Sequence, residues 1–507
     1  MPSFDSLSRL LGVLAAILGT YGASVYWRAE LSLSHYDAKA HLVVARRVFD
    51  SLTPSWEQFG AVWLPLPHVL NVVPVQIDWM YRTGASAIAI SIASYAVTVA
   101  CVAAIVRKAN GTRTGAILAA ALFALNPNVL YLQSTPMTEP LLFALSALVV
   151  LHLTEWVVSD ELRIRRAAGW TIVAACLTRY EAWAVVGTAM GLAALAKWQR
   201  APQKAQITSE PQEAQIAQKD YTWAVFREIA KLAIYPAATV LFFMGWSFAS
   251  TGVWFTTGGF YVSDPKLQGQ LGSVWDAIRE GTVTLGGASL VYYAEIAAAL
   301  LLLFAVARRR WSVMVMPIAL LATVALPLYA YYSGHPFRIR YEVPLILGAA
   351  ACLGTAVSML RLAAPLVAIP LLFIVVREAP PFDRQAPMIV EAQLDRQNGI
   401  ARRAVTECLQ RDYDGNTIMA SMGSLAHYMQ ELSHAGFDLG DFLHEGSGPM
   451  WQRAYYDEPS LFAGWVMVEE AAEGGDMLHQ KHVSWPAFLA AYDRVCEGGN
   501  VGLYRRR

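Results

Sequence analysis

The sequence is poor in charged residues. Asp, Glu, Lys and Arg make up 15% of its 507 residues, whereas 56% are hydrophobic. An ordinary soluble domain carries about 25% charged residues. The composition therefore excludes a typical soluble protein and favours a membrane protein. Acidic and basic residues balance to a formal net charge of zero. The basic surface of a nucleic-acid-binding protein is missing, and we expect no nucleic-acid partner.

Cysteine is also scarce, with five residues and no CxxC pair, and no metal site is predicted. The histidines at 35, 68, 335 and 427 show no ligand spacing either. Cys101, Cys176 and Cys352 fall in apolar runs and are expected to be small core residues. Cys408 and Cys496 lie in the polar C-terminal part. They can pair if that part faces an oxidising compartment, and otherwise remain thiols.

Long apolar runs are abundant, and about 20 apolar residues suffice to cross a bilayer. The run at 167–196 is interrupted by Arg179-Tyr180-Glu181 and predicts two helices that meet at this break. Counted this way, the sequence predicts about eleven transmembrane helices, the first an uncleaved anchor. The runs are 10–27, 86–106, 115–135, 140–158, 167–196, 232–252, 287–307, 312–333, 341–360 and 362–376.

Basic residues predict the orientation, because cytoplasmic loops are enriched in Lys and Arg. A cytoplasmic N-terminus places most basic residues inside, and the C-terminus outside. The inside positions are 107, 108, 113, 163, 165, 166, 197, 200, 204, 308–310 and 361. We expect an integral protein of a bacterial inner membrane, with 197–228 as a flexible cytoplasmic loop. Residues 34–85 and 253–286 are then outer loops, the former with helices lying at the interface.

The polar C-terminal part, 379–507, follows a transmembrane domain at 1–378. Its pattern predicts strands at 417–424, 464–470 and 501–506, with helices at 425–436 and 486–498. Alternation of strands and helices is typical of a small soluble α/β domain. The fold class is thus a multi-pass α-helical membrane protein with a C-terminal extracytoplasmic α/β domain.

Four polar clusters fall on the predicted outer side. The first is Tyr36, Asp37 and His41, followed by Glu57 and Trp63; the second is Glu139; the third is Arg179, Tyr180 and Glu181; the fourth is Arg338, Arg340 and Tyr341. Each has an ordinary alternative: a solvated turn, an acid at a helix N-terminus, a surface ion pair, or a lipid-headgroup contact. Glu295 lies deeper, and either lines the same cavity or bonds a neighbouring helix.

Ionisable groups at membrane depth are costly and tend to mark function. Four clusters on one side, each near a helix end, favour one site. Arginines there suit a phosphate, and a carboxylate suits general-base catalysis. This combination fits transfer of a sugar from a polyprenyl-phosphate donor at the outer surface.

The stretches that carry these residues are YDAKAHLVVARRV (36–48), VWLPLPHVL (62–70), NPNVLYLQSTPMTEPL (126–141), LTRYEAW (177–183) and FRIRYEVPL (337–345). On them, residues 8–376 resemble the GT-C superfamily of membrane glycosyltransferases, in the group of the protein O-mannosyltransferases and the aminoarabinose transferases. The resemblance implies Asp37 as the catalytic base and Arg338 or Arg340 as the contact to the donor phosphate. It also implies an envelope glycan, lipid or protein as acceptor.

One departure from the family pattern concerns the first motif. Many members carry Asp-Glu there, where this chain has Asp37-Ala38. The resemblance therefore leaves a divalent cation open, with Glu57 as a candidate second carboxylate. The alternative functions are a polytopic transporter or lipid flippase, and an inactive scaffold. A transporter predicts polar groups throughout the membrane depth and repeat symmetry.

Overall fold

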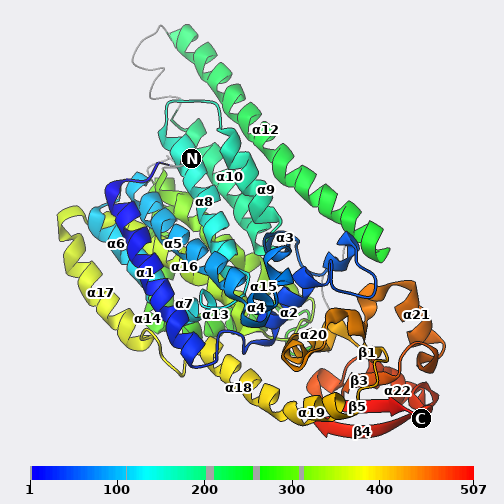
Figure 1. The fold of residues 1–507 in the computed structure, drawn as a ribbon. Helices are drawn as coiled ribbons and strands as arrows, with labels where there is room; N and C mark the ends of the chain where they lie inside the picture. Colours follow the sequence, from blue (N-terminus) through cyan, green and yellow to red (C-terminus); the bar gives the residue numbers. More distant parts are fainter. Residues whose placement is uncertain (1–2, 110, 201–210, 255–262, 308–312) are drawn as a thin grey trace.

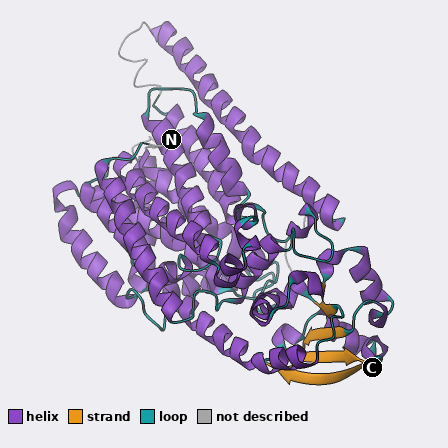
Figure 2. Ribbon diagram, viewed as in Figure 1, coloured by secondary structure: helices purple, strands orange, loops and turns teal. Residues whose placement is uncertain are grey.

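The computed structural model describes residues 3–109, 111–200, 211–254, 263–307 and 313–507. A bundle of helices occupies most of the molecule, and a small sheet lies at one end of it (Figures 1 and 2). The N-terminus lies at the opposite end of the bundle (Figure 1). We call these the sheet end and the N-terminal end.

The bundle contains most of the long apolar helices. Its elements are α1 (Ser6–Arg28), α5 (Ala85–Lys108), α6 (Arg113–Ala124), α7 (Pro127–Leu132), α8 (Glu139–Val158), α9 (Arg166–Cys176), α10 (Glu181–Trp198), α12 (Pro211–Thr251), α13 (Leu271–Gly286), α14 (Ala288–Ala307), η3 (Val313–Val324), α15 (Ala325–Tyr332), η4 (Ile339–Glu342), α16 (Val343–Ser358), η5 (Arg361–Ala363) and α17 (Ala364–Glu378). Within the described residues, seven helices are long and apolar enough to cross a membrane. The total of eleven spans stays a prediction, since the others are shorter.

The predicted break in the 167–196 run is confirmed. Helix α9 ends at Cys176 and α10 begins at Glu181, so Arg179 lies in the connection. The run at 115–135 is also divided, because Asn126 caps a new helix, α7, with Pro127 in its first turn. Proline is tolerated there because the first helical N–H groups have no partner within the helix.

Two expected loops contain helices. Helix α12 already begins at Pro211, so the prediction of a flexible loop is wrong for 211–228. The Gln, Ala, Lys and Glu of that stretch are good helix formers and extend the apolar helix that follows. Helix α13 occupies 271–286, where an outer loop was expected; it buries Val274, Ile278 and Leu285. Within these expected loops, residues 201–210 and 255–262 lie outside the described residues, as do the basic residues 308–310.

The N-terminal end of the bundle carries its own ionic contacts. Arg107 pairs with Asp5, and Lys108 pairs with Glu155. Lys197, at the end of α10, donates to the carbonyl oxygens of Trp156, Ser159 and Glu161.

Glu295 is about half exposed and pairs with Arg279 of α13 at 2.9 Å. Of its two expected roles, the structure thus shows the bond to a neighbouring helix.

Short helices follow α1 at the sheet end, as the sequence predicted for 34–85. They are α2 (Tyr36–Arg46), η1 (Trp56–Phe59), α3 (Leu66–Asn71), η2 (Pro74–Gln76) and α4 (Asp78–Thr83). Prolines 65, 67 and 74 keep this apolar stretch from forming one long helix.

The C-terminal part forms a five-stranded mixed sheet in the order β2-β1-β3-β5-β4. The strands are β1 (Ile418–Ala420), β2 (Phe442–Leu443), β3 (Trp465–Glu469), β4 (Tyr492–Gly498) and β5 (Val501–Arg506). The helices are α18 (Pro387–Ala401), α19 (Arg403–Asp412), α20 (Met422–Leu432), η6 (Ser433–Ala435), η7 (Leu439–Asp441), η8 (Glu445–Ser447), α21 (Pro449–Tyr456), η9 (Pro459–Leu461), η10 (Ala472–Gly474), α22 (Met477–Ser484) and η11 (Pro486–Leu489). Strands β1, β2 and β3 run parallel, and β5 runs antiparallel to both β3 and β4.

The helix expected at 486–498 is wrong, because residues 492–498 form β4. Gly499 and Asn500 both have positive φ, 56° and 68°, and join β4 to β5. Two such residues make a tight hairpin turn that matches the twist of the flanking strands. The hairpin partner therefore decides the conformation of a segment whose local pattern also suits a helix.

Cys408 of α19 and Cys496 of β4 form a disulfide, with their Cα atoms 6.6 Å apart. Cys101, Cys176 and Cys352 are free and buried, as expected. The disulfide fixes α19 to the edge strand of the sheet.

Candidate functional site

Asp37 is held at the start of α2 by contacts on both sides of the helix N-terminus. The ring nitrogen Nδ1 of His35 accepts the N–H of Asp37 at 3.2 Å, and Asp395 of α18 accepts the N–H of Tyr36 at 3.1 Å. The first N–H groups of a helix need such acceptors, and the helix dipole favours an anion there. Local structure thus stabilises the ionised carboxylate of Asp37.

Arg340 faces Asp37 from η4, just before α16. Its Nη1 lies 2.5 Å from Asp37 Oδ2, and both side chains are about nine-tenths buried. Burial by itself would raise the pKa of Asp37, but the charge of Arg340 and its bond to the carboxylate lower it to about 2. An opposite charge within contact distance favours the ionised form. Asp37 is therefore a carboxylate at neutral pH.

Arg340 also connects Asp37 to a second buried acid. Its Nε lies 3.3 Å from Oε1 of Glu139, which is completely buried at the start of α8. Arg179 reaches the same Glu139 oxygen at 3.0 Å and donates to Glu181 at 2.7 Å. Acids and arginines thus alternate from α2 through η4 and α8 to the α9–α10 break. Three acids and two arginines leave this network with one excess negative charge.

Two histidines and a tryptophan lie beside Asp37. The Nδ1 of His41 and Nε2 of His68 are 3.0 Å apart, and the Trp63 ring centroid is 4.2 Å from that of His41. Burial lowers the pKa of His41 well below its ordinary value and that of His68 to about 3. Both rings are neutral at pH 7, so this wall of the site is uncharged.

The structure brings most of the sequence-predicted site residues together. Tyr180 donates to the carbonyl of Val62 and thereby connects the α9–α10 break to the loop that carries Trp63. Tyr341 lies beside Arg340, with the guanidinium carbon 6.0 Å from its ring centroid. Tyr36 lies next to Asp37, whose charge raises the pKa of the phenol.

Two of the predicted site residues, Arg338 and Glu57, have no described contact with Asp37. Arg338 precedes η4, and its backbone N–H and carbonyl both bond the Tyr331 hydroxyl, whereas Arg340 makes the contact to Asp37. Glu57 lies exposed in η1, away from the buried network.

A divalent cation does not fit between the acids as they are arranged. The Arg340 guanidinium already lies between Asp37 and Glu139. Among the described residues, no group of three His, Cys, Asp or Glu side chains is placed to hold a metal ion. We therefore assign no step to a metal.

Sequence reasoning missed the supports of Asp37. His35 caps its helix, His68 bonds His41, and Lys39 pairs with Glu431 of α20 at 2.6 Å. Lys39 offers a weak signal in the sequence, since it is a lysine between two alanines, Ala38 and Ala40. Its partner lies 392 positions away and leaves no local pattern.

No protein-family model matches the chain, and no curated protein matches it by sequence. Solved structures do match. The oligosaccharyltransferase of Archaeoglobus fulgidus, complexed with Zn and sulfate, has a TM-score of 0.51 at 12% identity; the match covers 94% of this chain and 69% of that chain.

ArnT from Cupriavidus metallidurans is similar over nearly its whole length. Its structure bound to undecaprenyl phosphate gives a TM-score of 0.56 at 12% identity, and its apo structure gives 0.57 at 11%. Each match covers 96% of this chain and 97% of that chain. At such low identity the similarity concerns the fold. The chain shares its overall fold with the oligosaccharyltransferase and with ArnT.

Proposed function

We propose that this protein is an inverting glycosyltransferase that moves a sugar from a polyprenyl-phosphate donor to an acceptor at the outer face of a bacterial inner membrane. The observation that carries the proposal is the buried Asp37–Arg340 ion pair at the sheet end of the bundle. The GT-C fold supports it, as does undecaprenyl phosphate in the similar ArnT structure. The acceptor class is an envelope glycan, lipid or protein.

In the proposed reaction Asp37 takes the proton of the acceptor hydroxyl. The acceptor oxygen forms a bond to the sugar C1, and the bond from C1 to the phosphate oxygen breaks. Polyprenyl phosphate leaves with the electron pair, and its charge is stabilised by Arg340, with Arg338 nearby. A fixed cation where charge develops is among the strongest contributions to such a transition state.

Arg340 connects donor binding to the strength of the base. In the structure its guanidinium pairs with Asp37 and holds the pKa of that carboxyl at about 2. A donor phosphate competes for the same guanidinium. The carboxylate that loses its cation becomes more basic. Asp37 is then a weak base in the empty site and a stronger one with donor bound.

The remaining predicted site residues shape the pocket in this proposal. Glu139, Arg179 and Glu181 hold Arg340 from behind through their ion pairs. Tyr36, His41, Trp63, Tyr180 and Tyr341 offer aromatic and polar groups to the sugar and the acceptor, whereas Glu57 is exposed in η1 and has no assigned contact.

The proposed orientation places the N-terminal end of the bundle in the cytoplasm. Four basic residues lie at this end: Arg107 and Lys108 at the end of α5, Arg113 at the start of α6, and Lys197 at the end of α10. Cytoplasmic enrichment of Lys and Arg supports this assignment.

The Asp37→Asn variant tests the proposal. Asparagine keeps the size of the side chain but cannot accept the acceptor proton, so we expect turnover to fall by about 10²–10⁴. Binding of undecaprenyl phosphate, measured in nanodiscs, should survive because Arg340 is retained. Wild-type turnover in Asp37→Asn would contradict the proposal.

A further inference from the structure

Helix α2 presents two opposite faces. Asp37 and His41 are four residues apart and lie on the face toward Arg340 and His68. Lys39 and Arg46 are seven residues apart, which also places them on one face. At 100° per residue this second face is about 140–180° from the first. The back of the helix that carries Asp37 is thus available to other parts of the chain.

The back of α2 contacts the C-terminal part through a buried ion cluster. Lys39 Nζ lies 2.6 Å from Oε1 of Glu431 in α20, and Arg402 donates to both oxygens of Glu431 at 2.7 and 3.0 Å. Lys39 is 8% exposed and Arg402 is 5% exposed. Burial would raise the pKa of Glu431, but Lys39 and Arg402 lower it to about 2. We call these three residues the Glu431 cluster.

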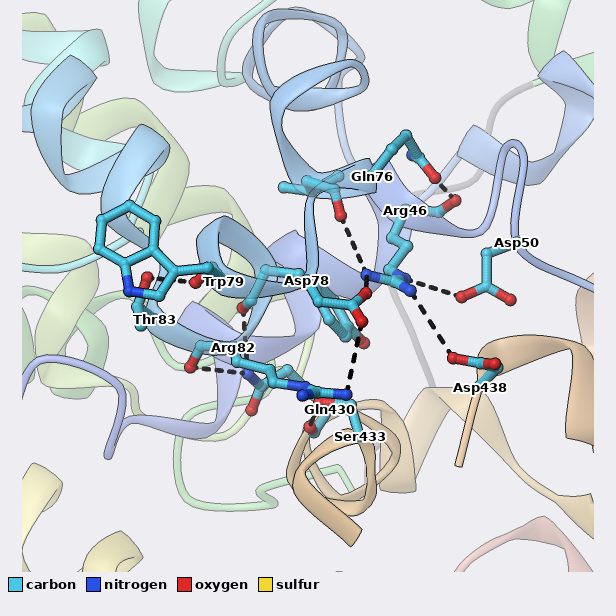
Figure 3. Close-up of polar contacts among 12 residues, drawn as sticks. Arg46, Asp50, Gln76, Asp78, Trp79, Arg82, Thr83, Gln430, Ser433 and Asp438 are labelled. Carbon is cyan, nitrogen blue, oxygen red and sulfur yellow. Dashed lines mark hydrogen bonds and ion pairs between the residues drawn. The ribbon is translucent and has the colours of Figure 1, made fainter. Parts of the chain in front are cut away.

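Arg46, at the far end of α2, makes its close contacts within the segment that follows α2 (Figure 3). It pairs with Asp50 at 2.7 Å and with Asp78 at 2.8 Å, and donates to the carbonyl of Val75. Asp438 of the C-terminal part lies 3.7 Å away and is mostly exposed, so it adds little. Figure 3 also shows Gln430 of α20, which donates to the carbonyl of Tyr81.

Apolar residues of α2 also pack with the C-terminal part. Ala40, Leu42, Val43 and Ala45 of α2 belong to the hydrophobic core that contains Val405, Ile418, Leu425 and Trp465 of the C-terminal part. The bundle has a separate core, which includes residues of α5, α6, α8, α10 and α16. Four apolar residues of α2 therefore share a core with the C-terminal part, whereas Ala38 belongs to the bundle core and Val44 to a third cluster. Asp37 pairs with Arg340 of the bundle.

From these contacts we infer that Lys39 and Glu431 are positioning residues, through which the C-terminal part holds α2 in the rotation and depth at which Asp37 meets Arg340. The inference rests on the proposed role of Asp37. It gives the C-terminal part a place in catalysis that is separate from any choice of acceptor.

A buried ion cluster suits this role better than it suits simple stabilisation. Replacing such a cluster by apolar residues is often neutral or stabilising, because desolvation offsets the attraction. An ion cluster requires specific partners, however, whereas apolar packing tolerates rotation of a helix. A misplacement of about 1 Å at a reacting group can cost on the order of 10²-fold in rate.

Lys39→Met is the decisive variant. It removes the bond between α2 and α20 but leaves Glu431 paired with Arg402, so the C-terminal part keeps its own ion pair. Lys39→Arg is the conservative variant that should restore the contact. Arg494→Gln is the matched control, because it removes an exposed cation of the same domain that pairs with Glu470 and Glu497.

Turnover of the full chain is measured with the radiolabelled polyprenyl-phosphate-sugar fraction of source membranes, using acceptor membranes that lack the endogenous protein. For Lys39→Met we expect kcat to fall about 10-fold or more, the KM for donor to change little, and the acidic limb of kcat/KM to move to higher pH. The acidic limb moves to higher pH because loosening the Asp37–Arg340 pair raises the pKa of Asp37, and a general base is active only above its pKa. Lys39→Arg and Arg494→Gln should match wild type.

Two results would overturn the inference. One is wild-type kcat and pH profile in Lys39→Met, per mole of folded protein. The other is a loss of kcat with an unmoved acidic limb, which a merely structural role would produce. Asp37→Asn, assayed alongside, separates the two proposals. Turnover in Asp37→Asn contradicts the proposed function itself, whereas an inactive Asp37→Asn with a normal Lys39→Met rejects only the positioning role.

Discussion

At the scale of single residues, Arg340 is the most informative side chain. It lies between Asp37 and Glu139, and all three are buried. Removing one partner of a buried ion pair leaves an uncompensated charge and typically costs 3–5 kcal/mol. Arg340 therefore stabilises the resting site, and in the proposed reaction it stabilises the leaving phosphate as well. Truncation of Arg340 should affect both properties, and the two must be measured separately.

We predict that Arg340→Ala weakens binding of undecaprenyl phosphate about tenfold or more, because a charge-assisted bond to phosphate is lost. Binding is measured on folded protein in nanodiscs. Arg107→Ala is the control, since Arg107 pairs with Asp5 at the N-terminal end of the bundle. Equal weakening in both variants would argue against a phosphate site at Arg340.

The two pH profiles of the reaction should differ. A general base works only when ionised, so activity is present above its pKa and lost as pH falls through it. In the free protein the pKa of Asp37 is about 2, held down by Arg340 against the opposing effect of burial. The profile of kcat/KM reports the free protein, and that of kcat reports the complex. We expect the acidic limb of kcat at the higher pH; coincident limbs would mean that donor does not displace Asp37 from Arg340.

At the scale of elements, the sequence analysis found the features that depend on local composition. Apolar runs located the bundle helices, and the polar triplet Arg179-Tyr180-Glu181 located the α9–α10 break. The sequence analysis also assigned the site residues to the outer side of the membrane, because charged groups avoid the membrane interior and gather at helix ends. The choice between Arg338 and Arg340, and the partner of Lys39, depend on the rotation and packing of whole helices. Those could not be read from local patterns.

The helix expected at 486–498 failed for a related reason. Its spacing of apolar residues suits either conformation, and the Gly499-Asn500 turn decides for a hairpin. Predictions from periodicity are ambiguous for short segments. The Gly499-Asn500 pair was the sequence feature that indicated a hairpin.

The hairpin turn permits a matched test of stability. At Gly499, φ is 56°, and an added Cβ would lie 2.8 Å from Cγ of Arg402 and 2.9 Å from the carbonyl oxygen of Asn398. At Gly415, φ is 82°, and nothing lies within 4 Å. Both alanine variants incur about 1–2 kcal/mol of backbone strain, but only Gly499→Ala adds a steric clash. We expect a larger decrease in thermal stability for Gly499→Ala; equal decreases would argue against the turn geometry.

At the scale of the whole molecule, two groups of charged residues lie at opposite ends of the bundle, whereas the Arg279–Glu295 pair lies between α13 and α14. Arg107, Lys108 and Lys197 gather at the N-terminal end, and the Asp37–Arg340 network lies at the sheet end. A transporter or flippase would require polar groups along the depth of the membrane. Concentration at one end instead suits a reaction at one surface. The proposed outer location also agrees with the Cys408–Cys496 disulfide, since disulfides persist in oxidising compartments.

Cysteine labelling can test this arrangement in intact cells. The three free cysteines are buried, so they give little background. Glu57 is exposed at the sheet end, and Arg113 is exposed at the start of α6. We predict that a membrane-impermeant maleimide labels Glu57→Cys in intact spheroplasts but labels Arg113→Cys only after permeabilisation. The opposite pattern would place the Asp37–Arg340 pair on the cytoplasmic side. A nucleotide-sugar donor would then be as accessible as a polyprenyl-phosphate sugar, and the proposed reaction would lose its reason for using a membrane-bound donor.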